Sequence, residues 1–315
     1  MSQRSDLPGI SVVVPSRDRA ELLDECLASL RRALRPSDEL IVADSASKDG
    51  SVADVARKHG ARVLRCEIAG TSRARNAGWR SARHDLIAFI DDDVRVYEDW
   101  ARALAETFAT SADASYVTGR IGPPPTPTKY LVAQKTDEDP MWLTGAADEL
   151  QGHAANLAVR RAALLETGGF DEELGPGTPL RAAEDLDFFE RLAARGFRGR
   201  YEPAAAGYHE SWRDVRDMFA LHWSYGIGLG ARLVKLARVN RARFGSVAKV
   251  TFLDEGLVPV FQMIRQRALR WTMIRLTRLV GVLVGIARAL PRGIVDGHFV
   301  ARRRDQLAVS RSEPR

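Results

Sequence analysis

Two hydrophobic periodicities alternate along the first ninety residues of the chain. Short runs of apolar, mostly β-branched residues have the length of buried strands, and the segments between them carry apolar residues at helical spacing. The predicted strands cover residues 10–14, 39–43, 61–66 and 86–90, and the predicted helices cover residues 19–34, 51–59 and 72–81. This alternation predicts an α/β fold with a mostly parallel sheet and right-handed crossovers.

Beyond residue 90 the pattern predicts fewer regular elements. Residues 116–121 predict one more strand and residues 185–195 a helix. Residues 122–127 read Gly-Pro-Pro-Pro-Thr-Pro, which excludes a helix or a central strand and predicts a loop. Gly226, Gly228 and Gly230 lack the spacing of a dinucleotide-binding loop and follow no strand, so they indicate close helix packing.

Three consecutive aspartates, at positions 91–93, directly follow the apolar run 86–90. In an open α/β sheet, ligands bind beyond the carboxyl ends of the strands. Neighbouring carboxylates repel one another unless a cation neutralises them, and Mg²⁺ is commonly held by one or two carboxylates together with substrate phosphates. The triplet therefore predicts a metal-phosphate site, although an acidic turn that caps the next helix would have the same composition.

Polar side chains also follow the other three predicted strands. Ser16 and Arg17 come after the first strand, the run from Asp44 to Gly50 after the second, and Arg73, Arg75 and Asn76 after the third. Arginine and amide side chains near a helix start can bind a phosphate or a base edge. Each stretch alone is typical of ordinary capping, but four polar strand ends in one sheet favour a nucleotide site.

Composition restricts the class of protein and its compartment. A chain of 315 residues with 45% hydrophobic content can bury a sizeable core. Two cysteines, Cys26 and Cys66, argue against a disulfide framework and fit a reducing compartment. Residues 1–8 contain no apolar signal region, so a cytoplasmic location is expected.

Charge divides the chain into two predicted domains. Residues 1–210 contain 27 Lys and Arg against 34 Asp and Glu, whereas residues 211–315 contain 20 against 7. The first range is the predicted catalytic domain. The strongly basic second range is a predicted helical extension for membrane association or oligomerisation, because a basic surface attracts a polyanion.

Several motifs occur in the order found in the family 2 glycosyltransferases, which the chain resembles over roughly residues 10–210. These motifs are Val-Val-Val-Pro-Ser-Arg-Asp-Arg at 12–19, Ile-Val-Ala-Asp-Ser-Ala-Ser-Lys-Asp-Gly at 41–50, Ala-Arg-Asn-Ala-Gly at 74–78, Phe-Ile-Asp-Asp-Asp at 89–93, Asn-Leu-Ala-Val-Arg-Arg at 156–161, Gly-Gly-Phe-Asp-Glu at 168–172 and Ala-Glu-Asp-Leu-Asp at 183–187. The resemblance implies the GT-A fold, which binds nucleotide-diphosphate sugars, and inverting sugar transfer.

The resemblance also implies donor and metal contacts for individual residues. The residues implied to bind the nucleotide sugar are Pro15, Ser16, Arg17, Asp44, Arg73, Arg75, Asp91 and Asp92, with Asp44 hydrogen-bonded to a uracil-type base and Asp91 facing the ribose. The implied ligands of a divalent metal, Mg²⁺ or Mn²⁺, are Asp93, Asp91 and His209. One departure from the family pattern is Ala46, which interrupts the polar run of the second turn and puts side-chain contacts from that turn in doubt.

A second acidic cluster is the predicted catalytic base. Inverting transfer is a single in-line displacement, so a carboxylate must accept the proton of the attacking hydroxyl. Glu184 and Asp185 begin a predicted helix, whose dipole favours an ionised carboxylate. By the resemblance, Asp185 is the base and Glu184 positions the acceptor. Trp142 and His153 lie in a Gly-containing segment, residues 141–155, and are further candidates for the acceptor pocket.

These observations predict a metal-dependent glycosyltransferase that uses a nucleotide-diphosphate sugar, with a UDP-sugar favoured, and a glycan or lipid-linked acceptor of the cell envelope. Two alternatives remain. A nucleotidyltransferase would also bind a nucleotide, but it generally needs a Gly-rich basic loop after the first strand. A non-catalytic, membrane-bound protein that binds nucleotide sugars would not need Glu184 and Asp185.

The basic extension predicts an amphipathic helix over residues 271–290. Its longest uncharged stretch is nine residues, 279–287, whereas a spanning helix needs about twenty apolar residues. Arginines fall within a sector of about 140° and most apolar residues lie opposite, with Trp271, Ile274 and Val282 as exceptions. This pattern predicts a helix on an anionic membrane surface, at the inner face of the cell membrane. The alternatives are packing on the catalytic domain and a homo-oligomer interface; no nucleic-acid recognition motif accompanies the charge.

Overall fold

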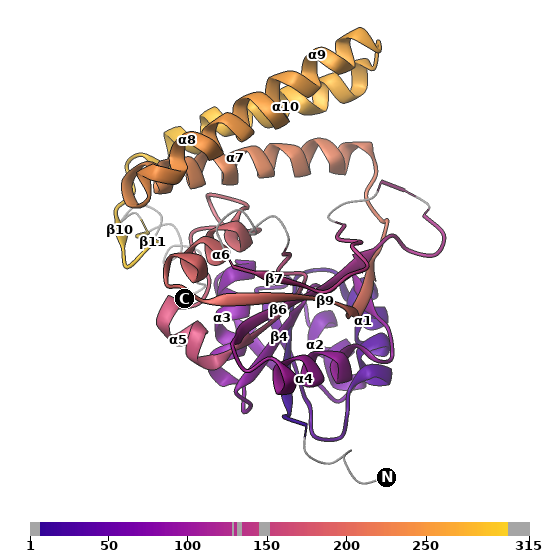
Figure 1. The fold of residues 1–315 in the computed structure, drawn as a ribbon. Helices are drawn as coiled ribbons and strands as arrows, with labels where there is room; N and C mark the ends of the chain where they lie inside the picture. The colour runs from indigo at the N-terminus through magenta and orange to yellow at the C-terminus, as the bar shows by residue number, and fades with distance from the viewer. Residues whose placement is uncertain (1–6, 128, 131–133, 145–151, 302–315) are drawn as a thin grey trace, which may run out of the picture. The chain divides into compact units, whose positions relative to one another are not determined.

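The computed structural model describes residues 7–127, 129–130, 134–144 and 152–301, which carry the colour ramp in Figure 1. The chain divides into two compact units, Met1–Phe170 with Phe188–Trp212, and Asp171–Asp187 with Arg213–Arg315. The predicted domain boundary at 210 lies close to the boundary at Trp212. The segment Asp171–Asp187, however, belongs to the second unit, because its Leu174 and Leu180 are fully buried among C-terminal apolar side chains.

Among the described residues, the first unit contains a nine-stranded sheet. Its strands are β1 (Ile10–Ser16), β2 (Glu39–Ser45), β3 (Arg62–Cys66), β4 (Leu86–Ile90), β5 (Val94–Val96), β6 (Ala114–Gly122), β7 (Met141–Leu143), β8 (Asn156–Arg160) and β9 (Arg198–His209). The strand order is β3-β2-β1-β4-β8-β6-β9-β5, and β7 pairs with β9.

The predicted parallel sheet is present in the N-terminal part of this order. β1 is parallel to both β2 and β4, and β2 is parallel to β3. β8 is antiparallel to both β4 and β6, so the remaining part of the sheet is mixed. β6 confirms the strand predicted at 116–121.

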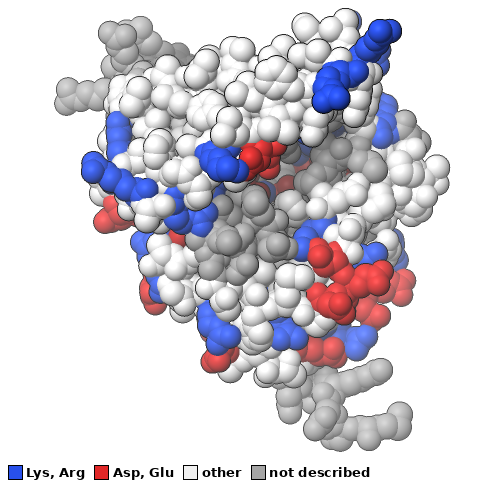
Figure 2. Space-filling model, turned by 45° about the horizontal axis from the view of Figure 1, so that its top comes forward, with Lys and Arg blue, Asp and Glu red and all other residues white. Residues whose placement is uncertain are grey.

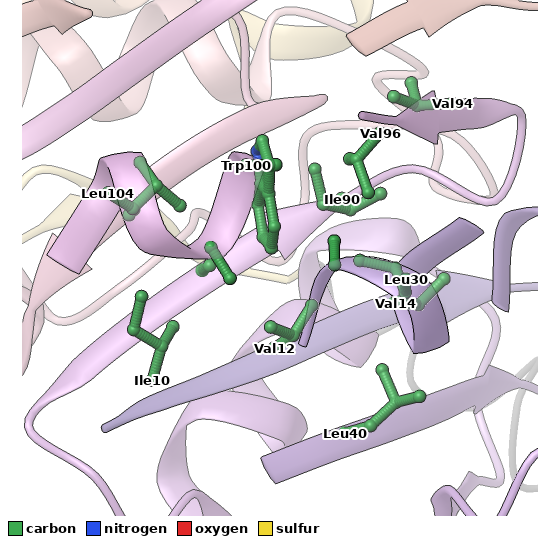
Figure 3. Close-up of a cluster of buried hydrophobic side chains, with 14 of the residues drawn as sticks. Ile10, Val12, Val14, Leu30, Leu40, Ile90, Val94, Val96, Trp100 and Leu104 are labelled. Carbon is green, nitrogen blue, oxygen red and sulfur yellow. The ribbon is translucent and has the colours of Figure 1, made fainter. Parts of the chain in front are cut away.

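Helices pack on both faces of the sheet. They are α1 (Ala20–Ala33), α2 (Ser51–Lys58), α3 (Thr71–Ser81), α4 (Trp100–Thr110), α5 (Arg161–Thr167) and the part of α6 (Glu184–Ala194) that belongs to the first unit. Val12 and Val14 of β1 share an apolar cluster with Leu30 of α1 and Trp100 of α4, which Figure 3 shows in close-up. Val13 faces the opposite cluster, because successive strand side chains point to opposite faces, and a strand covered on both faces must be apolar throughout.

The described part of the second unit is mostly helical. After the first turn of α6 it contains α7 (Val215–Val239), α8 (Arg241–Lys249), the π-helix η2 (Val250–Leu257), α9 (Val258–Arg265) and α10 (Leu269–Ala289), then the short pair β10 (Ile294–Val295) and β11 (His298–Phe299). α7 begins after Asp214, whose carboxylate accepts hydrogen bonds from two backbone N–H groups of the first turn in a capping box.

The helices α7 and α10 lie side by side, as Figure 1 shows, and glycines allow their backbones to approach closely. A Cβ atom on Gly226 would lie 2.1 Å from the carbonyl oxygen of Arg278, and one on Gly230 would lie 2.1 Å from that of Val282. The prediction that these glycines serve helix packing is therefore confirmed. None of the helices in the described residues is both long enough and apolar enough to cross a membrane.

Candidate active site

The loops after β1 and β4 meet at the point where the strand order reverses. The chain runs from β1 outward to β2 and β3 and then returns to the other side of β1 as β4. Loops that leave two adjacent parallel strands in opposite directions open a crevice between them, and this is where open α/β sheets bind ligands. The topology therefore brings Ser16 and Arg17 close to the aspartates 91–93, as the sequence predicts.

Asp92 is the aspartate of the triplet that ties these two loops together. Its Oδ2 accepts a hydrogen bond of 2.7 Å from the Ser16 hydroxyl, and its Oδ1 lies 2.5 Å from Nη2 of Arg19. Burial and the neighbouring carboxylate of Asp93 raise the pKa of Asp92 to about 7, although Arg19 and Ser16 act in the opposite direction. Asp92 is fully buried, and its contacts with Ser16 and Arg19 join the loops after β1 and β4.

Asp93 also contacts Arg19, at 3.4 Å, and it has two further partners of its own. The indole Nε1 of Trp212 donates a hydrogen bond of 2.8 Å to its Oδ2, and Nε2 of His209 lies 3.4 Å from its Oδ1. The pairing of β5 with β9 sets this geometry, because it puts Val94 directly opposite His209. Asp93 and His209 therefore lie close together in the structure, as predicted.

The predicted three-residue metal set is only partly assembled. Asp91 is turned toward Arg75, whose Nη2 donates a 2.6 Å hydrogen bond to its Oδ1. Over the residues that the structure describes, no group of three or more His, Cys, Asp or Glu side chains forms a metal-binding cluster. One carboxylate and one imidazole nevertheless fit a divalent cation whose other ligands are water and phosphate oxygens. Asp93 and His209 can therefore serve as the protein ligands of such a cation. Asp91 is instead hydrogen-bonded to Arg75.

Arg75 is held rigidly beside Asp91. Its side chain is 2% exposed, and its guanidinium lies 5.2 Å from the ring centroid of Phe170. Asp91 itself keeps 28% of its side chain exposed. An accessible carboxylate oriented by a buried arginine is suited to accept a hydrogen bond from a ribose hydroxyl. Arg73 is directed differently, because its Nη1 donates to the carbonyl oxygen of Ala69.

Asp44 lines a hollow of about 370 Å³ beside β3 and α2. Its Oδ1 accepts the N–H of Ser47 at 2.9 Å, and its Oδ2 accepts a 2.5 Å hydrogen bond from Arg65. The hollow is also lined by Lys48 and Arg57. A buried carboxylate with cations around it can bind the polar edge of a base. The surroundings of Asp44 are therefore compatible with the predicted hydrogen bond to a base.

The turns after β1 and β2 are joined by hydrogen bonds between Asp18 and the segment 47–48. The Asp18 N–H donates to the Ser47 hydroxyl at 3.1 Å, and the Lys48 N–H donates to the Asp18 carboxylate at 2.8 Å. Asp18 and Ala46 both adopt left-handed backbone, with φ of 53° and 58°. Pro15 is buried in β1, whereas Arg17 stays exposed beside Asp18.

The predicted catalytic base lies in the second unit. Glu184 and Asp185 form the first turn of α6, and Oδ1 of Asp185 accepts the N–H of Leu186 at 2.8 Å. The two residues Arg181 and Ala183 just before this turn have φ of 62° and 67°. Non-glycine residues in this region are strained by about 1–3 kcal/mol each, and such strain persists only where the surrounding contacts enforce it.

The structure separates the two candidate acceptor residues. His153 precedes Asn156, which pairs with Ile90 at the end of β4, so His153 lies at the same edge of the sheet as the aspartate triplet. Trp142 of β7 lies four strands away from β4 in the strand order, about 19 Å at the usual strand spacing of ~4.8 Å. Its ring packs under the guanidinium of Arg198, 4.4 Å from the centroid.

Sequence reasoning missed three side chains of this region. Arg19 binds Asp92 and Asp93, Trp212 binds Asp93, and Arg65 binds Asp44. Arg19 and Arg65 lie near predicted strand ends, which is a weak signal. Trp212 gave none, because only the pairing of β9 with β5 brings it to the triplet.

The fold and the site together define the class of the protein, an α/β protein with an acidic site at the carboxyl ends of its parallel strands. Residues 11–165 match the family described as Glycosyl transferase family 2. The "Pre-mycofactocin glycosyltransferase" of Mycobacterium tuberculosis is 30% identical over 236 residues, which cover 69% of this chain and 46% of that protein. The "Glucosyl-dolichyl phosphate glucuronosyltransferase" of Haloferax volcanii is 29% identical over 53% of this chain and 57% of that protein.

Solved structures agree with this fold. The mannosyltransferase PcManGT from Pyrobaculum calidifontis, in complex with GDP-Man and Mn2+, has a TM-score of 0.59 at 18% identity and covers 90% of this chain and 88% of that chain. TarS 1–349 from S. aureus, in complex with UDP, has a TM-score of 0.51 at 17% identity, with 93% and 96% covered. The chain spans about half the length of the curated relatives it matches. It belongs to the family 2 glycosyltransferases and has the GT-A fold.

Proposed function

We propose that the chain catalyses metal-dependent, inverting transfer of a sugar from a nucleotide-diphosphate donor to a hydroxyl acceptor. The observation that carries the proposal is the polar cluster after β4, where Asp93 lies beside His209 and Asp91 is oriented by Arg75. A divalent cation held there by Asp93 and His209 would stabilise the charge that develops on the leaving diphosphate.

The side chains of the first unit bind and orient the donor. Asp91 accepts a hydrogen bond from the ribose, and Asp44 accepts one from the base. Asp44 can do so while bound to Arg65, because an ionised carboxylate has about four acceptor positions. The resemblance favours a UDP-sugar, and two structural neighbours were solved in complex with GDP-Man and with UDP.

Asp185 is the proposed general base. As the acceptor oxygen attacks the anomeric carbon and the bond to the diphosphate breaks, the hydroxyl proton passes to the Asp185 carboxylate. Glu184 would position the acceptor.

The substitution Asp185→Asn keeps the side-chain shape but removes the proton acceptor. We expect kcat to fall by about 10²–10⁴-fold with the donor dissociation constant unchanged, as steady-state kinetics and calorimetric titration would show. Equal losses in donor binding and turnover would instead assign Asp185 to donor contact.

A donor panel tests the proposed reaction as a whole. The protein is incubated with UDP-, GDP- and dTDP-sugars and with Mg²⁺ or Mn²⁺, and release of the nucleoside diphosphate is measured with and without chelator. Release of one nucleoside diphosphate, abolished by chelator, is the expected result. Pyrophosphate release from a nucleoside triphosphate and a sugar phosphate would indicate a nucleotidyltransferase, and binding without turnover would indicate a non-catalytic protein.

We further propose a lipid-linked or cell-envelope glycan acceptor and attachment to the inner face of the membrane. The support is an exposed apolar face on η2, α9 and α10, formed by Leu253, Leu257, Val258, Phe261, Ile264, Leu269, Met273, Leu276, Val280 and Leu283. Arg265, Arg267 and Arg270 are exposed at the turn between α9 and α10. Figure 2, which turns the top of Figure 1 forward, shows a largely uncharged upper surface with basic side chains at its right-hand end.

The occupant of this apolar face is inferred from its chemistry. Exposed leucine and phenylalanine side chains next to arginines suit a helix pair that lies in the headgroup layer of an anionic bilayer. The relative from Haloferax volcanii is named for a dolichyl phosphate substrate, which agrees with a lipid-linked acceptor. Self-association of the chain through the same face is the competing outcome.

A further inference from the structure

A buried ion cluster joins the C-terminal helices to the segment that carries the proposed base. Lys235 of α7, 3% exposed, contacts the carboxylate of Asp171 and lies 2.6 Å from Oδ1 of Asp187. Both carboxylates are almost completely buried. Asp171 and Asp187 are the first and last residues of the chain segment that belongs to the second unit. One lysine therefore holds both ends of this segment.

Backbone groups also bind this cluster. The Asp171 carboxylate accepts the N–H of Phe299 at 2.8 Å and that of Glu173 at 3.0 Å. The Lys235 ammonium donates to the carbonyl oxygen of Gly297 at 2.8 Å and lies 4.7 Å from the Phe299 ring centroid. The hairpin of β10 and β11 thus closes the cluster from the C-terminal side.

Further contacts fix the middle of the segment. Arg292 binds the buried carboxylate of Glu173 at 3.3 Å, and Arg288 donates to the carbonyl oxygen of Pro179 at 3.1 Å. A Cβ atom on Gly228 of α7 would lie 2.5 Å from the backbone of Ala182. These contacts lie next to Arg181 and Ala183 in the chain, and they hold the two residues in their strained left-handed backbone conformation.

Stability alone does not account for a cluster of this kind. Buried ion pairs are often no more stabilising than apolar residues of similar volume, but they require one geometry, and loss of one partner leaves a buried unpaired charge. Asp187 lies two residues after Asp185, in the same first turn of α6. The orientation of this turn is therefore coupled to Lys235.

We propose that Lys235 is a positioning residue for catalysis: by binding Asp171 and Asp187 together it fixes the first turn of α6 and so the carboxylate of Asp185. The inference rests on the proposed function of Asp185. It assigns the C-terminal helices a part in the reaction that is separate from any contact with a membrane.

The test compares Lys235→Met with the matched control Lys249→Met, which removes an exposed lysine paired with Asp254 in the same unit. Lys235→Met should lower kcat by about 10- to 100-fold, since small misplacements of a catalytic group cost this much. The dissociation constant of the nucleoside diphosphate should not change, because its proposed contacts belong to the first unit. Lys249→Met should leave both quantities at the wild-type values.

Hydrogen exchange provides a readout that is independent of turnover. In Lys235→Met the amides of residues 173–187 should exchange faster, while peptides from β1 to β4 keep their wild-type rates. If the wild type shows no turnover with any donor, the proposed function fails, and the exchange result alone decides whether Lys235 fixes the segment. Wild-type kcat together with wild-type exchange in Lys235→Met would overturn the inference.

A double variant covers the case in which Lys235→Met does not fold. Lys235→Met with Asp187→Asn keeps the net charge of the cluster while removing the link, so a folded protein with low kcat and unchanged nucleotide affinity is expected. In the wild type, the amides of residues 173–187 should exchange only together with those of α7. Exchange of this segment independently of α7 would contradict the inference whichever variants fold.

Discussion

At the scale of single residues, the three adjacent aspartates differ in their partners, although Asp92 and Asp93 both contact Arg19. Asp91 is oriented by Arg75, Asp92 is buried against Ser16 and Arg19, and Asp93 lies beside His209. Successive residues in a turn must diverge in direction. For this reason the sequence predicts an acidic site here, while the division of roles requires the partners that the fold brings to each carboxylate.

Asp93→Ala tests the metal site. Turnover should fall by at least about 10²-fold, and metal-dependent nucleotide affinity should be lost, because one of the two proposed protein ligands of the cation is removed. The melting temperature should change little, since relief of repulsion among three carboxylates offsets the lost Trp212 hydrogen bond. Calorimetric titration of the nucleotide, with and without chelator, measures the metal-dependent affinity. Asp99→Ala, at an exposed aspartate paired with Arg102, is the matched control; full activity in excess chelator would falsify the metal assignment.

His222 of α7 predicts a pH dependence of stability. Burial, followed by the positive charges of Arg275 and Arg278, lowers its pKa to about 4. The unfolded chain takes up this proton near pH 6.5 and the folded chain only near pH 4, so stability present above pH 6.5 is lost as pH falls through this window. His222→Gln should therefore reduce the drop in melting temperature between pH 7.5 and pH 4.5. An identical drop in the variant would show that other groups cause the acid sensitivity.

At the scale of elements, the packing of α7 on α10 depends on glycines that leave no room for a side chain. Gly230→Ala would put a methyl group against the backbone of Val282, so the free energy of unfolding should decrease by about 1–3 kcal/mol. Gly245 of α8 has no atom within 4 Å of an added Cβ. Gly245→Ala should therefore increase the free energy of unfolding by up to about 1 kcal/mol, through helix propensity. Denaturant unfolding of both variants measures the contrast; equal effects would mean that backbone contact does not limit Gly230.

The same pair of helices explains an irregularity in the sequence pattern of α10. Trp271, Ile274 and Val282 lie outside the main apolar sector of this helix. Trp271 is 36% exposed in the structure, whereas Ile274 and Val282 are 1% exposed. Gly281 and Gly285 are buried with them, and a Cβ atom on either would touch the backbone of α7. α10 therefore has one apolar face for α7 and a second, exposed one. A helical wheel that assumes a single apolar face does not separate the face packed on α7 from the exposed face.

At the scale of the whole molecule, the exposed apolar face predicts binding to lipid. The variant Phe261→Ser/Leu283→Ser removes two large exposed side chains from this face, so flotation with anionic vesicles at low salt should decrease severalfold relative to the wild type. Leu165→Ser, at an exposed leucine of α5, is the matched control. The face is a self-association surface if the wild type does not bind anionic vesicles and the double substitution changes the oligomeric state. Light scattering measures the oligomeric state.

Full-chain variants are the appropriate material for this comparison. A truncation within α7 would remove Lys235 and the helices that bury Leu174 and Leu180. Loss of binding or activity in such a truncation would then combine the loss of the apolar face with the loss of support for α6. Substitutions of exposed side chains separate these effects.

The sequence by itself determined the strands and helices around the parallel part of the sheet, the acidic site after β4 and the family. Local periodicity decides these features, because a strand buried on both faces must be apolar throughout and the loop after it must be polar. The tertiary structure alone decided which side chains complete the site. Trp212 reaches Asp93 through the pairing of β9 with β5, and Lys235 joins Asp171 to Asp187 across about fifty to sixty residues of chain. Contacts between residues so distant along the chain leave no periodic signal, because they depend on how folded elements pack.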